Sequence, residues 1–123
     1  MKRATVGDYE SIYAVVSKYV EGCALGSSAV MKPAFYSKAI MHGYLNGALS
    51  TGPIQNLYDI VDKLGPAVGY KVRVDIISVE ATVACVHVVL ENWHGLTFAD
   101  LHQLLKVDGE WKIISKVFHQ YDD

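Results

Sequence analysis

The sequence predicts an α+β fold, in which helices come first and a curved antiparallel sheet then wraps a central pocket. Two observations lead to this prediction. In the first half of the chain, apolar residues recur at every third or fourth position, as on one face of a helix. From Lys71 onward the period becomes two, and short turns separate the apolar stretches. Helices segregated from antiparallel strands define the α+β class.

Length and composition limit the class of protein. At 123 residues the chain fits one domain, which we expect to span residues 1–123. Hydrophobic residues make up 51% of the chain and charged residues 20%, as in a globular protein with its own core. The net charge of −2 and the scattered Lys and Arg argue against nucleic acid as a partner, because phosphate binding needs a basic face.

The sequence also bears on the location of the protein. No stretch approaches the roughly 18 apolar residues of a transmembrane helix, so no membrane partner is expected. The opening residues, Met1 to Ala4, lead into a helix-like pattern and not into an apolar signal run. Cys23 and Cys85 lie far apart within apolar segments, and two buried reduced thiols are favoured over a disulfide or a reactive pair. A cytoplasmic location is therefore expected.

The first helix is predicted from about Tyr9 to Leu25. Asp8 is its expected N-cap, Gly26 ends it, and its apolar residues follow the spacing of one helical face: Ile12, Val15, Val16, Tyr19, Val20 and Cys23. A short second helix is predicted from Ser27 or Ser28 through Phe35, because Pro33 would break a longer one.

A strand, a turn and a second short strand are predicted between Ala39 and Leu49. The turn candidates are Gly43, Asn46 and Gly47. A third helix then opens at Thr51-Gly52-Pro53, because proline suits the first turn of a helix, and Gly65-Pro66 ends it.

Long strands are predicted over the rest of the chain. The first begins at Lys71, and the next three run from Thr82 to Trp93, from Thr97 to Val107 and from Glu110 to Tyr121. Short turns at His94-Gly95 and Asp108-Gly109 make these strands antiparallel neighbours. On the last strand, alternation predicts one shared face for Trp111, Ile113, Ser115, Val117 and His119.

The C-terminal hairpin resembles that of a known family. Asp100 is followed by Leu-Leu-Lys-x-Asp-Gly-x-Trp-x-Ile at residues 104–113 and by Lys-Val-Phe-His at residues 116–119. Tyr19-Val20-Glu21-Gly22 and the segment from Phe35 to Met41 match the start and the strand entry of the same family. On these residues, and on the order of its elements, the chain resembles the putative lumazine-binding family. That family belongs to the nuclear transport factor 2-like superfamily, which includes ketosteroid isomerase-like and polyketide cyclase-like domains.

This resemblance implies a cone-shaped, cystatin-like roll, in which a strongly curved antiparallel sheet wraps around N-terminal helices and a pocket. It also implies dimerisation through the outer face of the sheet. Relatives include enzymes as well as non-catalytic binding domains, so function has to be inferred from the site. In the ketosteroid isomerase branch, the early strand supplies a catalytic carboxylate. Here no Asp or Glu lies between Gly22 and Asp59.

Histidines are the first candidates for chemistry, because histidine acts as an acid or a base near neutral pH. None of the five has the spacing of a metal-binding pair, and no cysteine or carboxylate completes a zinc set. We therefore expect neither a metal nor a cofactor. His42 lies on the early strand, where alternation gives it one face with Ile40 and Tyr44. It either replaces the missing isomerase carboxylate or is a hydrogen-bonded histidine in a partly buried wall.

A second set of candidates lies on the C-terminal hairpin. Asp100 and His102 share one strand face, and the turn at Asp108-Gly109 brings that strand beside Ser115 and His119. An Asp–His pair would orient the imidazole ring and raise the pKa of the histidine. The alternative is a structural hydrogen bond or a cross-strand pair, including Asp100 with Lys116.

Tyrosines complete the candidate set. Tyr13 and Tyr19 on the first helix and Tyr44 on the early strand each combine an apolar ring with a polar tip. Such side chains either line a pocket for a flat ligand or fill the core. The ligand-binding set predicted from the sequence is therefore Tyr13, Tyr19, His42, Tyr44, Asp100, His102, Ser115 and His119.

Three functions stay open at this point. The favoured one is a small-molecule-binding domain that works as a homodimer and takes a small hydrophobic or heteroaromatic molecule. The second is a cofactor-free isomerase, dehydratase or cyclase that uses His42 with Asp100, His102 or His119. The third is a purely structural dimerisation module. The enzyme hypothesis predicts that His42 and at least one of the three hairpin residues face one shared cavity.

Overall fold

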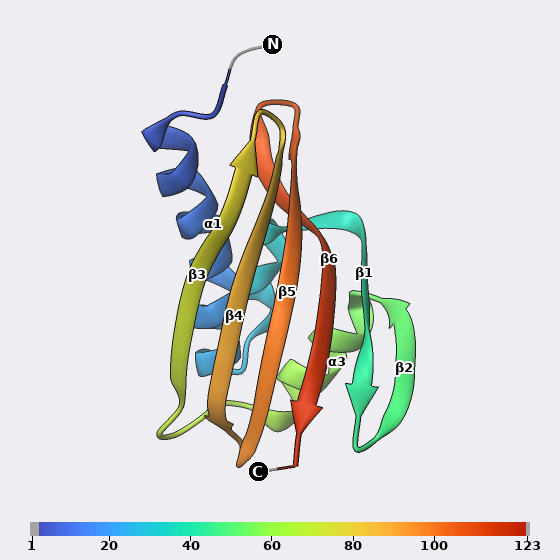
Figure 1. Cartoon of the computed structure of the whole chain (residues 1–123). Helices are drawn as coiled ribbons and strands as arrows, with labels where there is room; N and C mark the ends of the chain where they lie inside the picture. Colours follow the sequence, from blue (N-terminus) through green and yellow to red (C-terminus); the bar gives the residue numbers. More distant parts are fainter. Residues whose placement is uncertain (1–2, 123) are drawn as a thin grey trace.

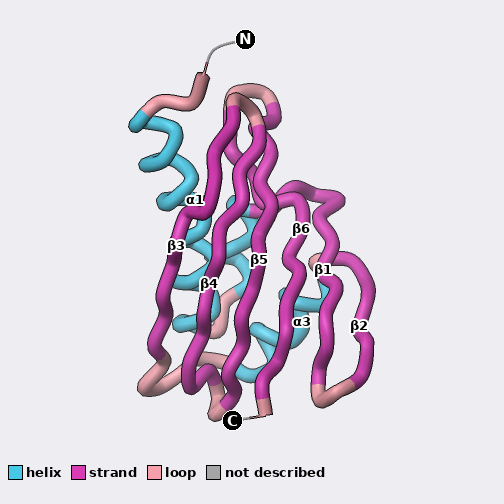
Figure 2. The backbone as a smooth tube through the Cα atoms, viewed as in Figure 1, coloured by secondary structure: helices cyan, strands magenta, loops and turns pink. Residues whose placement is uncertain are grey.

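Helices cover one face of a six-stranded sheet in the computed structural model, which describes residues 3–122 (Figures 1 and 2). The predicted α+β class and order of elements are confirmed. The helices are α1 (Val6–Leu25), α2 (Ser28–Met31), the short 3-10 helix η1 (Lys32–Ala34) and α3 (Gln55–Leu64). The strands are β1 (Phe35–Leu45), β2 (Ala48–Pro53), β3 (Lys71–Glu80), β4 (Val83–Trp93), β5 (Leu96–Val107) and β6 (Glu110–Tyr121).

The strands lie in the order β2-β1-β6-β5-β4-β3. The four C-terminal strands, β3 to β6, are antiparallel neighbours, as their short turns predicted, but β1 runs parallel to β6. A long stretch of chain separates β1 from β6, so no tight turn imposes an antiparallel direction on this pair. Both α1 and α3 lie behind the sheet in Figure 1, and the space between helices and sheet holds the core. Within residues 3–122, no helix is long and apolar enough to cross a membrane.

The start of α1 differs from the prediction by three residues. Thr5 is the N-cap, and Asp8 is the third residue of the helix, where its side chain accepts a 2.9 Å hydrogen bond from the Thr5 backbone N–H. The two residues form a reciprocal capping box. Gly26 ends the helix in the left-handed conformation, as predicted. The buried face of α1 carries Tyr19 into the core and leaves Tyr13 52% exposed.

The opening of the third helix is a second difference. Asn46 and Gly47, with φ of 50° and 77°, make the turn between β1 and β2, and Gly43 lies inside β1. Residues 51–53 pair with β1 as the end of β2, and α3 begins only at Gln55. Pro53 is tolerated in β2 because β2 is an edge strand, which has one side free of ladder hydrogen bonds.

A β-bulge in β6 decides which side chains of this strand face the helices. Gln103 pairs with Ser115 and Leu104 pairs with Ile113, so Ile114 is an extra residue without a partner on β5. Trp111 and Ile113 are buried before the bulge, as are Lys116 and Phe118 after it. Because side chains alternate along a strand, the extra residue shifts every later side chain of β6 to the opposite face.

Candidate functional site

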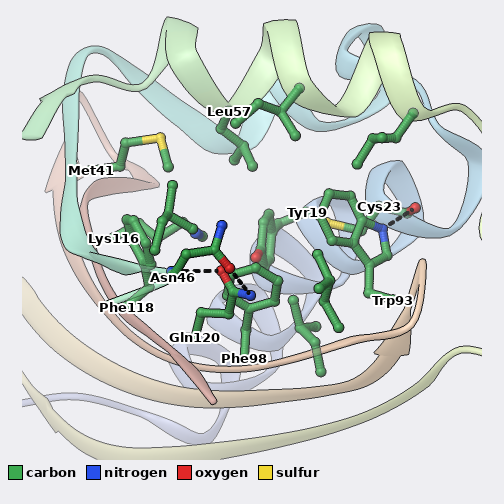
Figure 3. Close-up of a pocket in the computed structure, with 15 residues that line it drawn as sticks. Tyr19, Cys23, Met41, Asn46, Leu57, Trp93, Phe98, Lys116, Phe118 and Gln120 are labelled. Atoms are coloured by element: carbon green, nitrogen blue, oxygen red, sulfur yellow. Dashed lines mark hydrogen bonds between the residues drawn. The ribbon is translucent and has the colours of Figure 1, made fainter. Parts of the chain in front are cut away.

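An apolar cavity of about 220 Å³ lies between α3 and the inner face of the sheet (Figure 3). Leu57, Ile60 and Leu64 of α3 line one wall, and aromatic side chains of the sheet, including Trp93, Phe98 and Phe118, line another. At the open side, the Asn46 and Gln120 side chains are paired by a 3.1 Å hydrogen bond from Gln120 Nε2 to Asn46 Oδ1. The walls are therefore mainly apolar, with a few polar side chains among the lining residues.

Four polar side chains meet beside this cavity, and we call them the buried polar cluster: Tyr19, Asp100, His102 and Lys116. All four are at most 4% exposed. The Tyr19 hydroxyl donates a 2.7 Å hydrogen bond to Asp100 Oδ2, and His102 Nε2 lies 3.3 Å from the same oxygen. Lys116 Nζ lies 3.8 Å from the other oxygen, Oδ1. Tyr19 and Lys116 line the cavity, and Asp100 contacts both.

Burial and neighbouring charges set the protonation states of the buried polar cluster. Burial opposes the ionised form of Asp100, but the Lys116 ammonium and the hydrogen bonds from His102 and Tyr19 outweigh it and hold the pKa of the carboxyl below its ordinary value. Burial lowers the pKa of His102 more than the adjacent Asp100 raises it. The expected upward shift of the pKa of this histidine is therefore wrong. Burial, together with the charge of Asp100, raises the pKa of Tyr19 well above 10.

These states define the hydrogen bonds of the cluster. Because an ionised carboxylate only accepts hydrogen bonds, Tyr19 and His102 both donate to Asp100, and the proton of the neutral imidazole lies on Nε2. Two buried polar atoms have no hydrogen-bond partner among residues 3–122, namely Asp100 Oδ1 and His102 Nδ1. Unpaired buried polar atoms are costly, so they mark places where a bound molecule or water gains most from a polar contact.

Three of the eight residues predicted from the sequence lie together here: Tyr19, Asp100 and His102. The pairing of Asp100 with Lys116 across the hairpin, one of the two alternatives for Asp100, is also found. The expectation that His42 shares their cavity is wrong. On β1 the buried, inward positions are Ala39, Met41 and Gly43.

His42 and Tyr44 therefore lie on the outer face of β1, where Tyr44 is 48% exposed. The Gly52 backbone N–H donates a 3.2 Å hydrogen bond to His42 Nδ1, which fits the structural alternative for this histidine. The alternation of side chains along the strand correctly placed His42 and Tyr44 on one face of β1. Alternation does not show which of the two faces is covered by helices, because that depends on the packing of α3 over β1.

Ser115 and His119 lie on the face of the sheet away from the cavity. Ser115 donates a 3.0 Å hydrogen bond to Gln103 Oε1, and His119 is exposed beside Val117. The bulge at Ile114 causes this difference, because the predicted alternation assumed an unbroken strand. For the same reason Lys116 was missed as a cavity residue. The adjacent apolar pair Ile113-Ile114, which breaks the period of two, is the signal that would have found it.

Tyr13 also lies outside the site, since it faces solvent on α1. Both cysteines are free, and Cys23 lines the cavity with a thiol whose pKa burial raises to about 12. Among residues 3–122, no three His, Cys, Asp or Glu side chains gather as a metal site.

A curved sheet that encloses a cavity against its helices defines a nuclear transport factor 2-like domain. The chain belongs to the family described as Putative lumazine-binding, whose model matches residues 7–119. A curated protein named Aldolase FrzH, from Cladobotryum sp, is 33% identical over 121 residues, which cover 98% of this chain and 97% of that protein.

Solved structures agree with this assignment. A nuclear transport factor 2-like protein of unknown function from Shewanella baltica superposes with a TM-score of 0.90 at 34% identity, covering 99% of this chain and 100% of that one. Another such protein, from Methylobacillus flagellatus, superposes with a TM-score of 0.89 at 38% identity, covering 96% of this chain and 95% of that one. A ketosteroid isomerase-like protein from Erwinia carotovora atroseptica superposes with a TM-score of 0.69 at 13% identity, covering 97% of this chain and 100% of that one. At this identity the likeness shows a shared fold alone.

Proposed function

We propose that this protein binds a small, flat and mainly apolar molecule, such as a heteroaromatic compound, in the cavity under α3. The observation that carries the proposal is the cavity itself, whose lining is mainly apolar and includes Tyr19 and Lys116. An apolar protein cavity of about 150 Å³ is known to hold benzene. At about 220 Å³, the cavity has room for a substituted ring or a small fused bicycle. The family description agrees with a ligand of this kind.

Titration with indane, a fused bicyclic hydrocarbon, tests the proposal by NMR. The indole N–H resonance of one tryptophan reports on the cavity, and that of the other serves as the control. Trp93 lines the cavity and donates its indole N–H to the Cys23 carbonyl oxygen, whereas the Trp111 indole N–H donates to Asp8 Oδ1. We expect the indole N–H resonance of Trp93 to shift on titration and that of Trp111 to stay in place.

A cavity-filling variant locates the binding site. Ile60 lines the cavity, and Ile60→Phe is expected to weaken indane binding by tenfold or more, since the added ring occupies the space of the ligand. The control is Val68→Phe, at a position that is 89% exposed, and this variant is expected to bind indane with unchanged affinity. Equal binding by both variants, or no Trp93 shift in the native protein, would contradict the proposal.

A second candidate is a cofactor-free enzyme that acts on a carbonyl compound. The observation that favours it is the 33% identical relative named aldolase, together with an ionised carboxylate and a lysine beside the cavity. Aldol and isomerase chemistry both begin with removal of a proton next to a carbonyl group. The protein in D₂O is then expected to accelerate deuterium uptake at C2 of 1-indanone, measured by mass spectrometry. A rate equal to that in buffer would exclude this activity for the probe.

We also propose that the domain forms a homodimer through the outer face of the sheet. Leu101 and Val117 are directly opposite each other on β5 and β6, and they are 45% and 49% exposed on this face. Exposed apolar side chains in the middle of a sheet favour burial against a second surface. Sedimentation velocity at micromolar concentration is expected to give a dimer, and a monomer would contradict the proposal.

We also propose that the protein is located in the cytoplasm. Its two free cysteines agree with a reducing compartment.

A further inference from the structure

Lys116 is the side chain of the cavity whose hydrogen-bonding capacity is least used. It is 4% exposed, and its Nζ lies 4.2 Å from the centroid of the Phe118 ring and 3.8 Å from Asp100 Oδ1. The second distance is too long for a hydrogen bond, and Oδ1 has no hydrogen-bond partner among residues 3–122. The ammonium therefore has hydrogen-bond donors to offer to a molecule that enters the cavity (Figure 3).

The Tyr19 hydroxyl is already engaged, and the two amide side chains of the cavity are paired with each other, with Asn46 exposed to water. The Tyr19 hydroxyl carries one proton, which it donates to Asp100 Oδ2 at 2.7 Å. At the open side, Gln120 Nε2 donates to Asn46 Oδ1, and the Asn46 backbone N–H donates to Gln120 Oε1 at 3.2 Å. Water can hydrogen-bond to the remaining N–H groups of the exposed Asn46 side chain, whereas Lys116 is buried. Lys116 is therefore the buried donor best placed to bind an acceptor on the ligand.

Charge balance selects the kind of acceptor. The charges of Asp100 and Lys116 cancel each other, while Tyr19 and His102 are neutral. A carboxylate on the ligand would bring an uncompensated negative charge into a cavity with apolar walls, which is unfavourable. A carbonyl oxygen accepts a hydrogen bond from the ammonium without adding charge.

We infer that Lys116 Nζ binds the carbonyl oxygen of the ligand, so that the cavity selects neutral cyclic carbonyl compounds, such as ketones or lactams, over hydrocarbons and carboxylic acids. This inference rests on the proposed function. It specifies the class of ligand and names the residue that recognises it. The same contact would stabilise negative charge that develops on the oxygen if a neighbouring proton were removed.

The test compares three probes of one shape: indane, 1-indanone and indane-1-carboxylate. In the native protein, the ketone is expected to bind more tightly than the carboxylate. Its carbonyl infrared band should lie at lower wavenumber than in buffer, because a hydrogen bond from an ammonium polarises the C=O bond more than water does. A bound ketone whose band moves to higher wavenumber, as in an apolar solvent, would overturn the inference. So would a carboxylate that binds more tightly than the ketone.

A double variant removes the ammonium without leaving a lone buried charge. Lys116→Met together with Asp100→Asn is expected to shift the ratio of ketone affinity to indane affinity by about tenfold in favour of indane. Lys38→Met, on the exposed side of β1, is the matched control and should leave the ratio unchanged. An unchanged ratio in the double variant would overturn the role of Lys116.

The outcomes separate this inference from the function on which it rests. If indane shifts the Trp93 resonance but removal of the Lys116 ammonium leaves the ratio of ketone affinity to indane affinity unchanged, the cavity remains a binding site and the inference fails. If none of the three probes shifts Trp93, the proposed function fails as well.

Discussion

Replacement of Asp100 by Asn is expected to lower the free energy of unfolding by about 3–5 kcal/mol, the usual cost of removing one partner of a buried ion pair. Asn has nearly the same shape as Asp but carries no charge. Lys116, 4% exposed, would then keep a buried ammonium without its counter-charge. Tyr19 and His102 would also lose a charged acceptor for their hydrogen bonds. Urea-induced unfolding at neutral pH measures the loss.

Two further variants show whether the buried charge is the cause. Asp75 forms a 2.8 Å ion pair with Arg73 at the surface, so Asp75→Asn should leave the urea midpoint nearly unchanged. The double variant Asp100→Asn with Lys116→Met should recover most of the stability, because it removes both charges. If Asp100→Asn alone unfolds at the same urea concentration as the native protein, the ion pair is not the strong interaction that its burial indicates.

Stability is also expected to fall as the pH is lowered from about 6.5 toward 5. His102 is buried and neutral, and its pKa lies below the ordinary value of 6.5 that it regains in the unfolded chain. Below pH 6.5 the unfolded state therefore binds a proton that the folded state does not, and the free energy of unfolding decreases. For one such group, the free energy of unfolding changes by at most about 1.4 kcal/mol per pH unit.

The carboxylates act in a separate, more acidic range. Asp8, whose pKa is lowered to about 2 by hydrogen bonds from Thr5, Lys106 and Trp111, and Asp100 both have pKa values below those of the unfolded chain. Their contributions are present above about pH 4 and are lost as the pH falls further. The decline between pH 6.5 and 5 can therefore be assigned to histidine.

Urea midpoints measured at several pH values give this slope. His102→Gln, which removes the titrating group, is expected to flatten the profile between pH 6.5 and 5. His119→Gln, at an exposed position on the outer face, should leave it unchanged. A native profile that is flat in this range would show that His102 takes up its proton in the folded state as readily as in the unfolded chain.

Local patterns in the sequence were sufficient for most of the fold. The three-and-four spacing of apolar residues found α1 and its buried face, and Gly26 marked its end, because these signals depend on residues close together in the chain. The short turns of the C-terminal half gave the antiparallel order of β3 to β6 for the same reason. The opening of α3 was misplaced because residues 51–53 pair with β1, and the pairing of a distant strand overrides the local preference for a helix.

The candidate site was only partly predictable. Tyr19, Asp100 and His102 were found because each lies in a regular element whose covered face the apolar pattern indicates. His42 and Tyr44 were assigned to the wrong side of β1, and Lys116 was missed in favour of Ser115 and His119.

Local patterns and motifs in the amino-acid sequence are sufficient to predict the α+β class, the order of the elements and the family. They do not predict which faces of β1 and β6 enclose the cavity, and so which polar side chains meet there, because side chains on a strand alternate between two faces. This alternation shows which residues share a face, but helix packing selects the covered face of β1, and one unpaired residue, Ile114, reverses the faces along the rest of β6.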